Sequence, residues 1–231
     1  MPDRIVHFVF GLRPQDEPFH LLHYLAIESC RRVLEPDVIR LHVHHLPYGV
    51  YWDLARPLVE LHRVEPVAEV DAVSAEPLVD AHRYAHHADV IRLDVLAREG
   101  GMYADIDTLF VRPVPDEWWE AETVIGREAP VQSPDRAEPE SSVSNCLVMA
   151  RPGSRFVTTW RERIVEVMDG SWSAHSCRLA SRLVDEMPDA VTVVPKEAFS
   201  PFDHTPEGLR ALLEEPADPA QLEHTCSVHL C

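Results

Sequence analysis

Short β-rich runs alternate with helical stretches along the chain, and this alternation is the feature that most limits its fold. Residues 5–10 (IVHFVF) and 38–44 predict strands, whereas 19–34 and 79–98 place apolar side chains at helical spacing. Strands that alternate with helices form a largely parallel sheet covered by helices. We therefore predict an α/β fold in which helices flank a mostly parallel central sheet.

The second half of the chain continues the alternation. Further strands are predicted at residues 122–126, 144–150 and 191–195. Further helices are predicted at residues 154–168, before a stop at Gly170, and at 176–187. The polar, proline-bearing residues 129–142 predict a mobile surface loop rather than a domain boundary. We therefore expect residues 1–231 to form one domain.

The charge balance limits the ligands that the chain can bind. Its 231 residues include 39 Asp and Glu against 21 Lys and Arg, for a formal net charge of −18. An acidic surface repels the phosphate backbone of nucleic acids and anionic lipid surfaces. We therefore expect no nucleic-acid partner, whereas a phosphate ligand can still meet the carboxylates through a bridging divalent cation.

Hydropathy and cysteine usage indicate the compartment. No apolar run approaches the ~20 residues that a transmembrane helix needs. The first residues, MPDRIVHFVFG, contain Pro2 and Asp3 before a short strand-like run, which is unlike a secretory signal peptide. Five scattered cysteines, an odd number, indicate reduced thiols. We therefore predict a cytoplasmic protein without a transmembrane segment.

The stretch DVIRLDVLAREGGMYADIDTLF carries the chemistry. If residues 103–107 are extended, Asp105 and Asp107 point to the same side and Ile106 points into the core. Two carboxylates at this spacing can share one hard cation, Mg²⁺ or Mn²⁺, which keeps open positions for phosphate oxygens. The preceding helix and apolar strand direct the pair toward the carboxyl end of a sheet, where α/β proteins bind ligands. The alternative is a solvated pair of acids at a strand end.

Two further polar side chains precede the acids on the predicted helix. Asp89 and Arg92 lie three residues apart and therefore share a helix face. Alone they would form a surface salt bridge of little value. Beside Asp105 and Asp107, the carboxylate of Asp89 can accept hydrogen bonds from hydroxyl groups, and the guanidinium of Arg92 provides several N–H donors. Tyr103 precedes the acids and can stack or hydrogen-bond there.

These residues resemble the core motif of glycosyltransferase family 32 and are similar to the donor site of the clostridial glucosylating toxins. The family pattern is S-D-x-x-R, a helix, and then G-G-x-Y-x-D-x-D. This chain has A-D-V-I-R from Ala88 to Arg92 and G-G-M-Y-A-D-I-D from Gly100 to Asp107, at the family's spacings. Ala88 stands where the family has Ser.

The resemblance extends outward from this motif over most of the chain. The segment IVHFVFG looks like the family's first strand beside the nucleotide, which implies substrate contacts at Phe8 and Val9. SNCLVMARPGSRFV resembles a later strand on which Asn145 faces the acceptor. SVHL resembles a C-terminal stretch whose histidine, here His229, completes the metal shell.

The resemblance implies a GT-A fold and metal-dependent sugar transfer from a UDP- or GDP-sugar, with retention of configuration. The donor site would lie at residues 79–110 and the acceptor side at 143–231, and the acceptor is left open as a carbohydrate, lipid-linked, small-molecule or protein one. The implied ligands of Mn²⁺ or Mg²⁺ are Asp105, Asp107 and His229. The implied catalytic residues are Asp89, Arg92 and Asp107. The implied substrate contacts are Phe8, Val9, Asp89, Arg92, Tyr103, Asp105 and Asn145.

Two other functions fit parts of the motif. DIDTLF is similar to the Asp-x-Asp-Gly-Thr loop of haloacid-dehalogenase-type phosphatases, in which Asp105 would be the nucleophile. Gly is missing after Asp107, however, and the only lysine is Lys196. A nucleotide-sugar-binding protein without turnover is the second alternative, although the complete set of polar residues argues against lost activity.

The remaining histidines and cysteines raise one more question. The tail HTCSVHLC holds four potential zinc ligands, His224, Cys226, His229 and Cys231, at a spacing that matches no standard zinc finger. The histidines at 42–45 and 86–87 predict exposed or locally bonded side chains rather than metal ligands.

Overall fold

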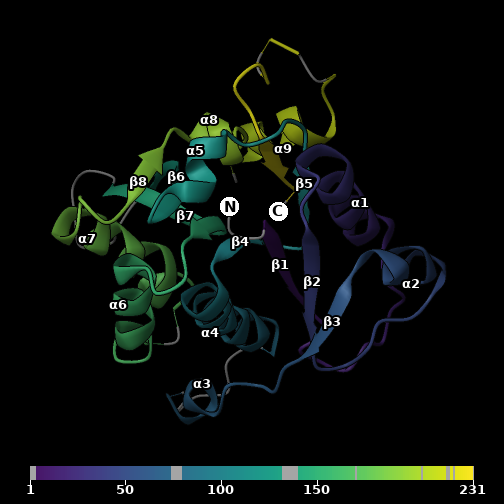
Figure 1. Cartoon of the computed structure of the whole chain (residues 1–231), viewed down its shortest axis with the longest axis horizontal. Coiled ribbons are helices and arrows are strands. Elements are labelled where there is room, and N and C mark those ends of the chain that lie inside the picture. Colours follow the sequence, from purple (N-terminus) through teal and green to yellow (C-terminus); the bar gives the residue numbers. More distant parts are fainter. Residues whose placement is uncertain are drawn as a thin grey trace.

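A computed structural model describes residues 4–73, 80–131, 140–169, 171–203, 205–216, 219–220 and 222–230 (Figure 1). Its strands are β1 (Ile5–Phe10), β2 (Val38–Val43), β3 (Glu60–Arg63), β4 (Gly101–Ala104), β5 (Thr108–Phe110), β6 (Thr123–Val131), β7 (Glu140–Ala150), β8 (Thr192–Val194) and β9 (Ser227–His229). Its α-helices are α1 (Leu21–Ser29), α2 (Val50–Ala55), α3 (Ala68–Val73), α4 (Asp80–Glu99), α5 (Asp116–Glu120), α6 (Arg155–Ile164), α7 (Leu179–Glu186), α8 (Lys196–Phe199) and α9 (Pro206–Leu213). Shorter 3-10 or π segments are η1 (Cys30–Leu34), η2 (Arg56–Leu58) and η3 (Ala174–Arg178).

Among the described residues, seven strands form the central sheet in the order β3-β2-β1-β4-β7-β6-β8. β1 pairs in parallel with β2 and β4, as do β2 with β3 and β6 with β8. β7 runs antiparallel to β4 and β6. The predicted α/β fold with a mostly parallel sheet is therefore confirmed. Because β2 lies on one side of β1 and β4 on the other, the strand order switches between β1 and β4, where such sheets bind ligands.

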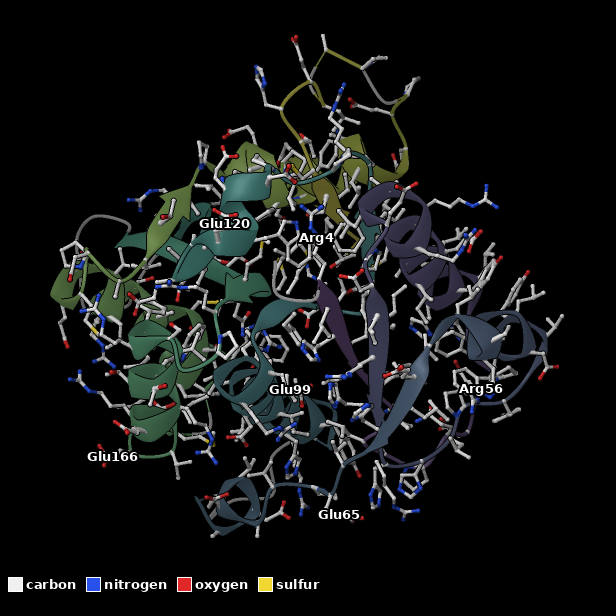
Figure 2. All side chains as sticks on the ribbon, in the orientation of Figure 1. Arg4, Arg56, Glu65, Glu99, Glu120 and Glu166 are labelled. Atoms are coloured by element: carbon white, nitrogen blue, oxygen red, sulfur yellow. The ribbon has the colours of Figure 1, made fainter. Side chains whose placement is uncertain are left out.

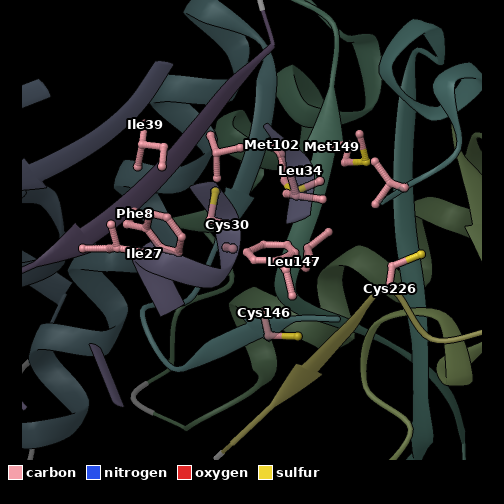
Figure 3. Close-up of a cluster of buried hydrophobic side chains, with 14 of the residues drawn as sticks. Phe8, Ile27, Cys30, Leu34, Ile39, Met102, Cys146, Leu147, Met149 and Cys226 are labelled. Carbon is pink, nitrogen blue, oxygen red and sulfur yellow. The ribbon is translucent and has the colours of Figure 1, made fainter. Parts of the chain in front are cut away.

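Side chains of the sheet alternate between two hydrophobic clusters, one on each face. Along β1, Phe8 belongs to the cluster that α1, α2 and α8 cover, whereas Val9 belongs to the cluster under α4, α6 and α7. β4 alternates in the same way, with Met102 in the first cluster and Tyr103 in the second. Figure 3 shows Phe8 and Met102 in the first cluster, near Cys30 of η1. Burial on both faces explains why these strands are apolar runs in the sequence.

The connection between α4 and β4 requires glycine at two positions. Gly100 and Gly101 have φ angles of +67° and +94°, a region that disfavours other residues. A Cβ atom on Gly101 would lie 2.4 Å from the carbonyl oxygen of Ile5. Without a side chain, β4 can lie close to β1, which sets the direction in which the following acids leave the sheet.

A buried pair of histidines supports the same connection. His7 Nε2 donates to the carbonyl oxygen of Gly100 at 2.9 Å, which leaves His7 Nδ1 to accept from His42 Nε2 at 3.0 Å. His42 and His87 are buried and locally bonded rather than exposed, and His87 Nδ1 accepts from the backbone N–H of Val67 at 2.9 Å. The prediction that these histidines are exposed or locally bonded is therefore confirmed for both through local bonding.

The motif strand is shorter than predicted. β4 ends at Ala104, and residues 105–107 form a turn closed by a hydrogen bond from Thr108 N to Asp105 O (3.0 Å). The prediction that residues 103–107 are extended is therefore wrong. Asp105 N still donates to the carbonyl oxygen of Cys146 (2.8 Å), in register with the pairing of β4 and β7, and the chain then turns to enter β5.

The end of α6 and the extent of one loop also differ from the prediction. α6 ends at Ile164 because β-branched valines of low helix propensity follow, and Gly170 lies outside the described residues. The expected loop at 129–142 is shorter, because β6 and β7 extend into it and pair Val131 with Glu140. Residues 132–139 within it, and the predicted helix start at position 79, lie outside the described residues.

The surface and the thiols agree with the composition. Figure 2 shows Glu65 and Glu166 near the outline of the molecule, and Glu120 is exposed as well, so part of the acidic excess lies at the surface. The four cysteines of the described ranges, Cys30, Cys146, Cys177 and Cys226, are free thiols. None of the described helices is both long and apolar enough to cross a membrane.

Candidate active site

The two aspartates of the motif converge with a histidine from the C-terminal strand. His229 Nε2 lies 3.1 Å from Asp107 Oδ1 and 3.9 Å from Asp105 Oδ2. One ligand atom from each residue lies within 4.8 Å of the other two. Their side chains are 27%, 31% and 14% exposed for Asp105, Asp107 and His229, so the cluster is sheltered but reachable. The structure thus brings together the three predicted metal ligands.

Strand pairing holds His229 in this position. β9 runs antiparallel to β5, with His229 opposite Thr108, and Leu230 N donates to Asp107 O at 3.0 Å. β5 is fixed in turn to α1, because Phe110 N donates to Ser29 Oγ at 3.1 Å. The tail therefore reaches the acids through backbone hydrogen bonds that no residue pattern in the sequence reveals.

A tyrosine and an arginine orient Asp105. Its Oδ1 accepts hydrogen bonds from the Tyr103 hydroxyl (2.7 Å) and from Arg92 Nη2 (3.2 Å). The other carboxylate oxygen, Oδ2, faces His229. The Arg92 guanidinium carbon also lies 4.5 Å from the centre of the Tyr103 ring, a cation–π distance. Asp105 is thus held with one oxygen bound by the protein and one oxygen toward the cluster.

Asp89 lies behind Asp105, on the other side of Arg92, and three side chains bind its carboxylate. Its Oδ1 accepts from Arg92 Nη2 (3.0 Å) and from Asn145 Nδ2 (2.8 Å). Its Oδ2 faces His175 Nε2 at 3.0 Å. Arg92 Nη1 donates to the carbonyl oxygen of Asn145, which ties β7 to α4. The predicted shared face of Asp89 and Arg92 is confirmed, and both side chains are buried rather than exposed.

Sequence reasoning missed His175 and its neighbour His86. His175 is fully buried on η3, and its backbone carbonyl accepts from Trp160 Nε1 at 3.0 Å. His86, one turn before Asp89 on α4, packs edge-on against the His175 ring at a centroid distance of 4.3 Å. Nothing in the spacing of His175, 86 residues beyond Asp89, indicates this contact.

The electrostatics of the cluster differ between its two acids. Burial raises the pKa of Asp105 above its ordinary value, although Arg92 and His229 act against this. Burial also acts to raise the pKa of Asp107, but the hydrogen bond and charge of His229 outweigh it and leave that pKa lowered. Burial works against the cation of Arg92, yet Tyr103 and the carboxylates raise its pKa above the ordinary value, so it stays charged.

A cavity of about 430 Å³ lies at the carboxyl end of β1, and His23 in its wall is close enough to Asp107 for their charges to interact. Val9 lines it from the sheet, His23 from α1, and Tyr84 and Ala88 from α4. Burial and the nearby His20 lower the pKa of His23 to about 4, although the charge of Asp107 opposes this, so His23 is neutral at pH 7. The structure places Val9 in the wall of this cavity, whereas the Phe8 side chain is buried in the core and supports the strand from below.

A second cavity, of about 380 Å³, lies beyond Asn145. Glu128 of β6, Ser144 of β7 and Cys177 of η3 are in its wall. Cys177 Sγ lies 3.6 Å from Asn145 Oδ1, and Ser142 Oγ donates to Glu128. Burial raises the pKa of Glu128 above its ordinary value. None of these residues other than Asn145 was predicted, because each is an isolated polar residue in its segment.

The donor set fits a divalent cation. Two carboxylate oxygens are the ligands that Mg²⁺ and Mn²⁺ prefer, and the imidazole nitrogen provides a third ligand atom. A bound ion would replace the proton that His229 shares with Asp107. Within the described ranges, this is the one group of three or more close ligand atoms, so the potential zinc ligands of the tail do not form a cluster of their own among the described residues. Cys226 is buried with its thiol toward Pro113 O (3.6 Å), and Cys231 lies outside the described residues.

Comparisons with known proteins agree with this arrangement. Residues 61–125, which include α4, β4 and both aspartates, match the family model of the glycosyltransferase sugar-binding region containing the DXD motif. The chain is 32% identical over 206 residues to glucan organizing enzyme 1 of Cryptococcus neoformans var. grubii. The match covers 86% of this chain and 54% of that protein, so the chain spans about half the length of this curated relative.

Two solved structures are similar in fold. PaToxG glycosyltransferase has a TM-score of 0.50 at 15% identity, over 81% of this chain and 70% of that one. The galactosyltransferase LgtC, in complex with donor and acceptor sugar analogs, has a TM-score of 0.51 at 15% identity, over 98% of this chain and 87% of that one.

A mixed sheet of this order, with an Asp-x-Asp turn leaving the carboxyl end of β4, gives the chain the GT-A fold that the LgtC structure also has. Within that fold, residues 61–125 match the glycosyltransferase sugar-binding region that contains the DXD motif. The resemblance predicted from the sequence is therefore confirmed, and these matches favour a transferase over the phosphatase alternative.

Proposed function

We propose that the chain transfers a sugar from a UDP- or GDP-sugar to an acceptor, with retention of configuration and with Mn²⁺ or Mg²⁺ bound by Asp105, Asp107 and His229. The observation that carries the proposal is the convergence of these three ligands beside a cavity at the switch point of the sheet. A bound cation would neutralise the charge that develops on the leaving diphosphate, as a Lewis acid.

The residues around the cluster suggest how the donor is held. We assign the nucleotide to the cavity lined by Val9 and His23, and the donor site to residues 79–110. Asp89 already accepts from three donors, which leaves about one of its four acceptor positions for a hydroxyl of the sugar. Arg92 makes its contacts with Asp89, Asp105 and Asn145, so we assign it to holding the two carboxylates as much as to binding the sugar.

The transfer step needs no covalent intermediate on the chain. The acceptor oxygen bonds to the anomeric carbon on the face from which the diphosphate departs, and the bond from that carbon to the phosphate oxygen breaks. The electron pair stays on the leaving phosphate, which takes the proton of the acceptor hydroxyl. Asn145 links Asp89 to the side that we assign to the acceptor, residues 143–231.

A thermal-shift panel of nucleoside diphosphates, with Mn²⁺, Mg²⁺ or chelator, tests the proposal. At about 100 times its Kd a ligand stabilises the folded state by about 2.7 kcal/mol, or roughly 5–10 °C in Tm for a chain of this size. We expect this shift from UDP or GDP only with a divalent ion, and its loss in Asp107→Asn. An equal shift in excess chelator would show that the nucleotide binds without the cation.

A further inference from the structure

The second cavity has a lining that suits one class of ligand. Its wall contains two aromatic rings, Trp172 and Phe202, and two carboxylates, Glu128 and Asp203. Trp172 is 60% exposed, a large exposure for a side chain of this size. Ser144 adds a hydroxyl group at the base of the cavity.

The cavity and the proposed donor site share a wall. Cys177 Sγ, in the cavity lining, lies 3.6 Å from Asn145 Oδ1. Asn145 Nδ2 donates to Asp89 Oδ1 at 2.8 Å, and Ser144 directly precedes Asn145 on β7. A ligand in the cavity would therefore lie on the far side of the Asp89 group from the nucleotide cavity.

The segment that bears Trp172 is fixed to the same group. Three residues further along, His175 contacts Asp89 Oδ2 at 3.0 Å, and Trp160 Nε1 holds the His175 carbonyl oxygen at 3.0 Å. The rim of the cavity and the carboxylate of Asp89 are thus parts of one hydrogen-bonded unit. Such a connection places a bound ligand accurately relative to the reacting sugar.

The chemistry of the lining selects among possible acceptors. An aromatic ring provides an apolar plane, and carboxylates accept hydrogen bonds from hydroxyl groups, so the two together match a sugar ring. Glu128 and Asp203 disfavour an anionic ligand, although Lys196 Nζ lies 4.0 Å from Asp203. A purely apolar lipid chain would remove both carboxylates from water, which is costly even though Ser142 donates to Glu128 and Thr205 donates to Asp203.

We propose that this cavity is the acceptor site and that the acceptor is an uncharged sugar ring, with Trp172 stacked on its apolar face and Glu128 and Asp203 accepting from its hydroxyls. This inference rests on the proposed glycosyl transfer. Its test does not, because sugar binding is measured without donor, without a divalent ion and in chelator.

Saturation-transfer NMR of the full chain with neutral oligosaccharides of glucose, galactose and mannose provides the test, supported by tryptophan fluorescence. We expect at least one neutral sugar to bind and to shift the emission, Trp172→Ala to weaken binding roughly tenfold, and Trp172→Phe to retain most of it. Tyr48→Ala, an exposed aromatic outside this cavity, is the matched control and should bind as the native chain does. Glu128→Gln provides a second variant at the opposite wall, with an expected severalfold loss.

Each outcome decides the proposal. Binding lost in Trp172→Ala and kept in Asp107→Asn supports it even if no nucleotide sugar is turned over. Equal binding by Trp172→Ala and the native chain, preference for uronic acids over neutral sugars, or no binding by any panel sugar overturns it. The affinities of a glycolipid and of a glycopeptide that bear the preferred sugar are then compared with that of the free sugar. Tighter binding of one of them would indicate an acceptor sugar that is attached to a lipid or to a peptide.

Discussion

Replacing Arg92 with Met should destabilise the fold as well as the site. Arg92 is 4% exposed, and its Nη2 lies 3.0 Å from Asp89 and 3.2 Å from Asp105. The substitution keeps the length of the side chain but leaves two carboxylates without their cation. Breaking a buried ion pair by removing one partner costs about 3–5 kcal/mol. For a chain of this length the expected fall in Tm is roughly 6–20 °C.

Urea denaturation followed by circular dichroism measures this loss. The matched control is Arg98→Met on the same helix, because Arg98 is exposed and its contact with Glu99 should contribute about 0–1 kcal/mol. Adding Asp89→Asn to Arg92→Met should restore part of the stability, since one uncompensated charge disappears. A loss below about 1 kcal/mol in Arg92→Met, or one equal to that of Arg98→Met, would refute the assignment of Arg92 as the cation that holds the two carboxylates.

Three further results are expected. Burial lowers the pKa of His7 to about 4 and that of His42 to about 3, so between pH 6.5 and 4 the unfolded chain binds protons that the folded chain does not. The free energy of unfolding should therefore decrease as the pH decreases, by up to about 1.4 kcal/mol per pH unit for each histidine. An unchanged pH dependence in His42→Gln would contradict this. His175→Leu should lower kcat/KM by about ten- to a hundredfold, because Asp89 loses the N–H donor of His175. His175→Gln keeps an N–H donor and should retain more activity. Equal losses in the two variants would show that His175 serves only to pack the core. Gly101→Ala should lower the free energy of unfolding in urea by more than about 2 kcal/mol, because its Cβ would lie 2.4 Å from Ile5 O. Gly153→Ala, which has a φ of +71° but open space around the Cβ, should lower it by about 1 kcal/mol. Equal losses would show that the backbone conformation alone matters.

Local patterns in the sequence predict the elements that carry the motif. The spacing of Asp89 and Arg92 on a helix, the Gly100–Gly101 stop and the short strand after it all occur where expected. These features depend on neighbours within a few residues, so periodicity and the conformational freedom of glycine are sufficient to find them.

Contacts between distant segments could not be predicted in the same way. The two carboxylates meet through a turn at residues 105–107 rather than through strand alternation, because the chain turns toward β5 directly after the bond from Asp105 N to Cys146 O on β7. His175 reaches Asp89 only after α6 and η3 pack on α4. Glu128 and Trp172 come together in a cavity wall from β6 and the segment that precedes η3, and neither shows a motif in its own segment.

His229 shows both sides of this division. A resemblance of four residues, SVHL, indicated its place, while the pairing of β9 with β5 is what brings it to 3.1 Å from Asp107. Phe8 shows the opposite case, because the resemblance implied a substrate contact and strand alternation places its side chain in the core.

The most direct test of metal-dependent glycosyl transfer is the release of nucleoside diphosphate from UDP- and GDP-sugars with and without a divalent ion, followed by chromatography of the nucleotides with Mn²⁺ and by proton NMR of the sugar with Mg²⁺. We expect nucleoside diphosphate and sugar in equal amounts, only in the presence of a divalent ion, with the sugar first appearing as the retained anomer. Asp107→Asn should remain folded and lose this release about a hundredfold or more, a loss of about 2.7 kcal/mol in transition-state stabilisation. Undiminished release in chelator or in Asp107→Asn, or phosphate trapped covalently on Asp105, would contradict the account.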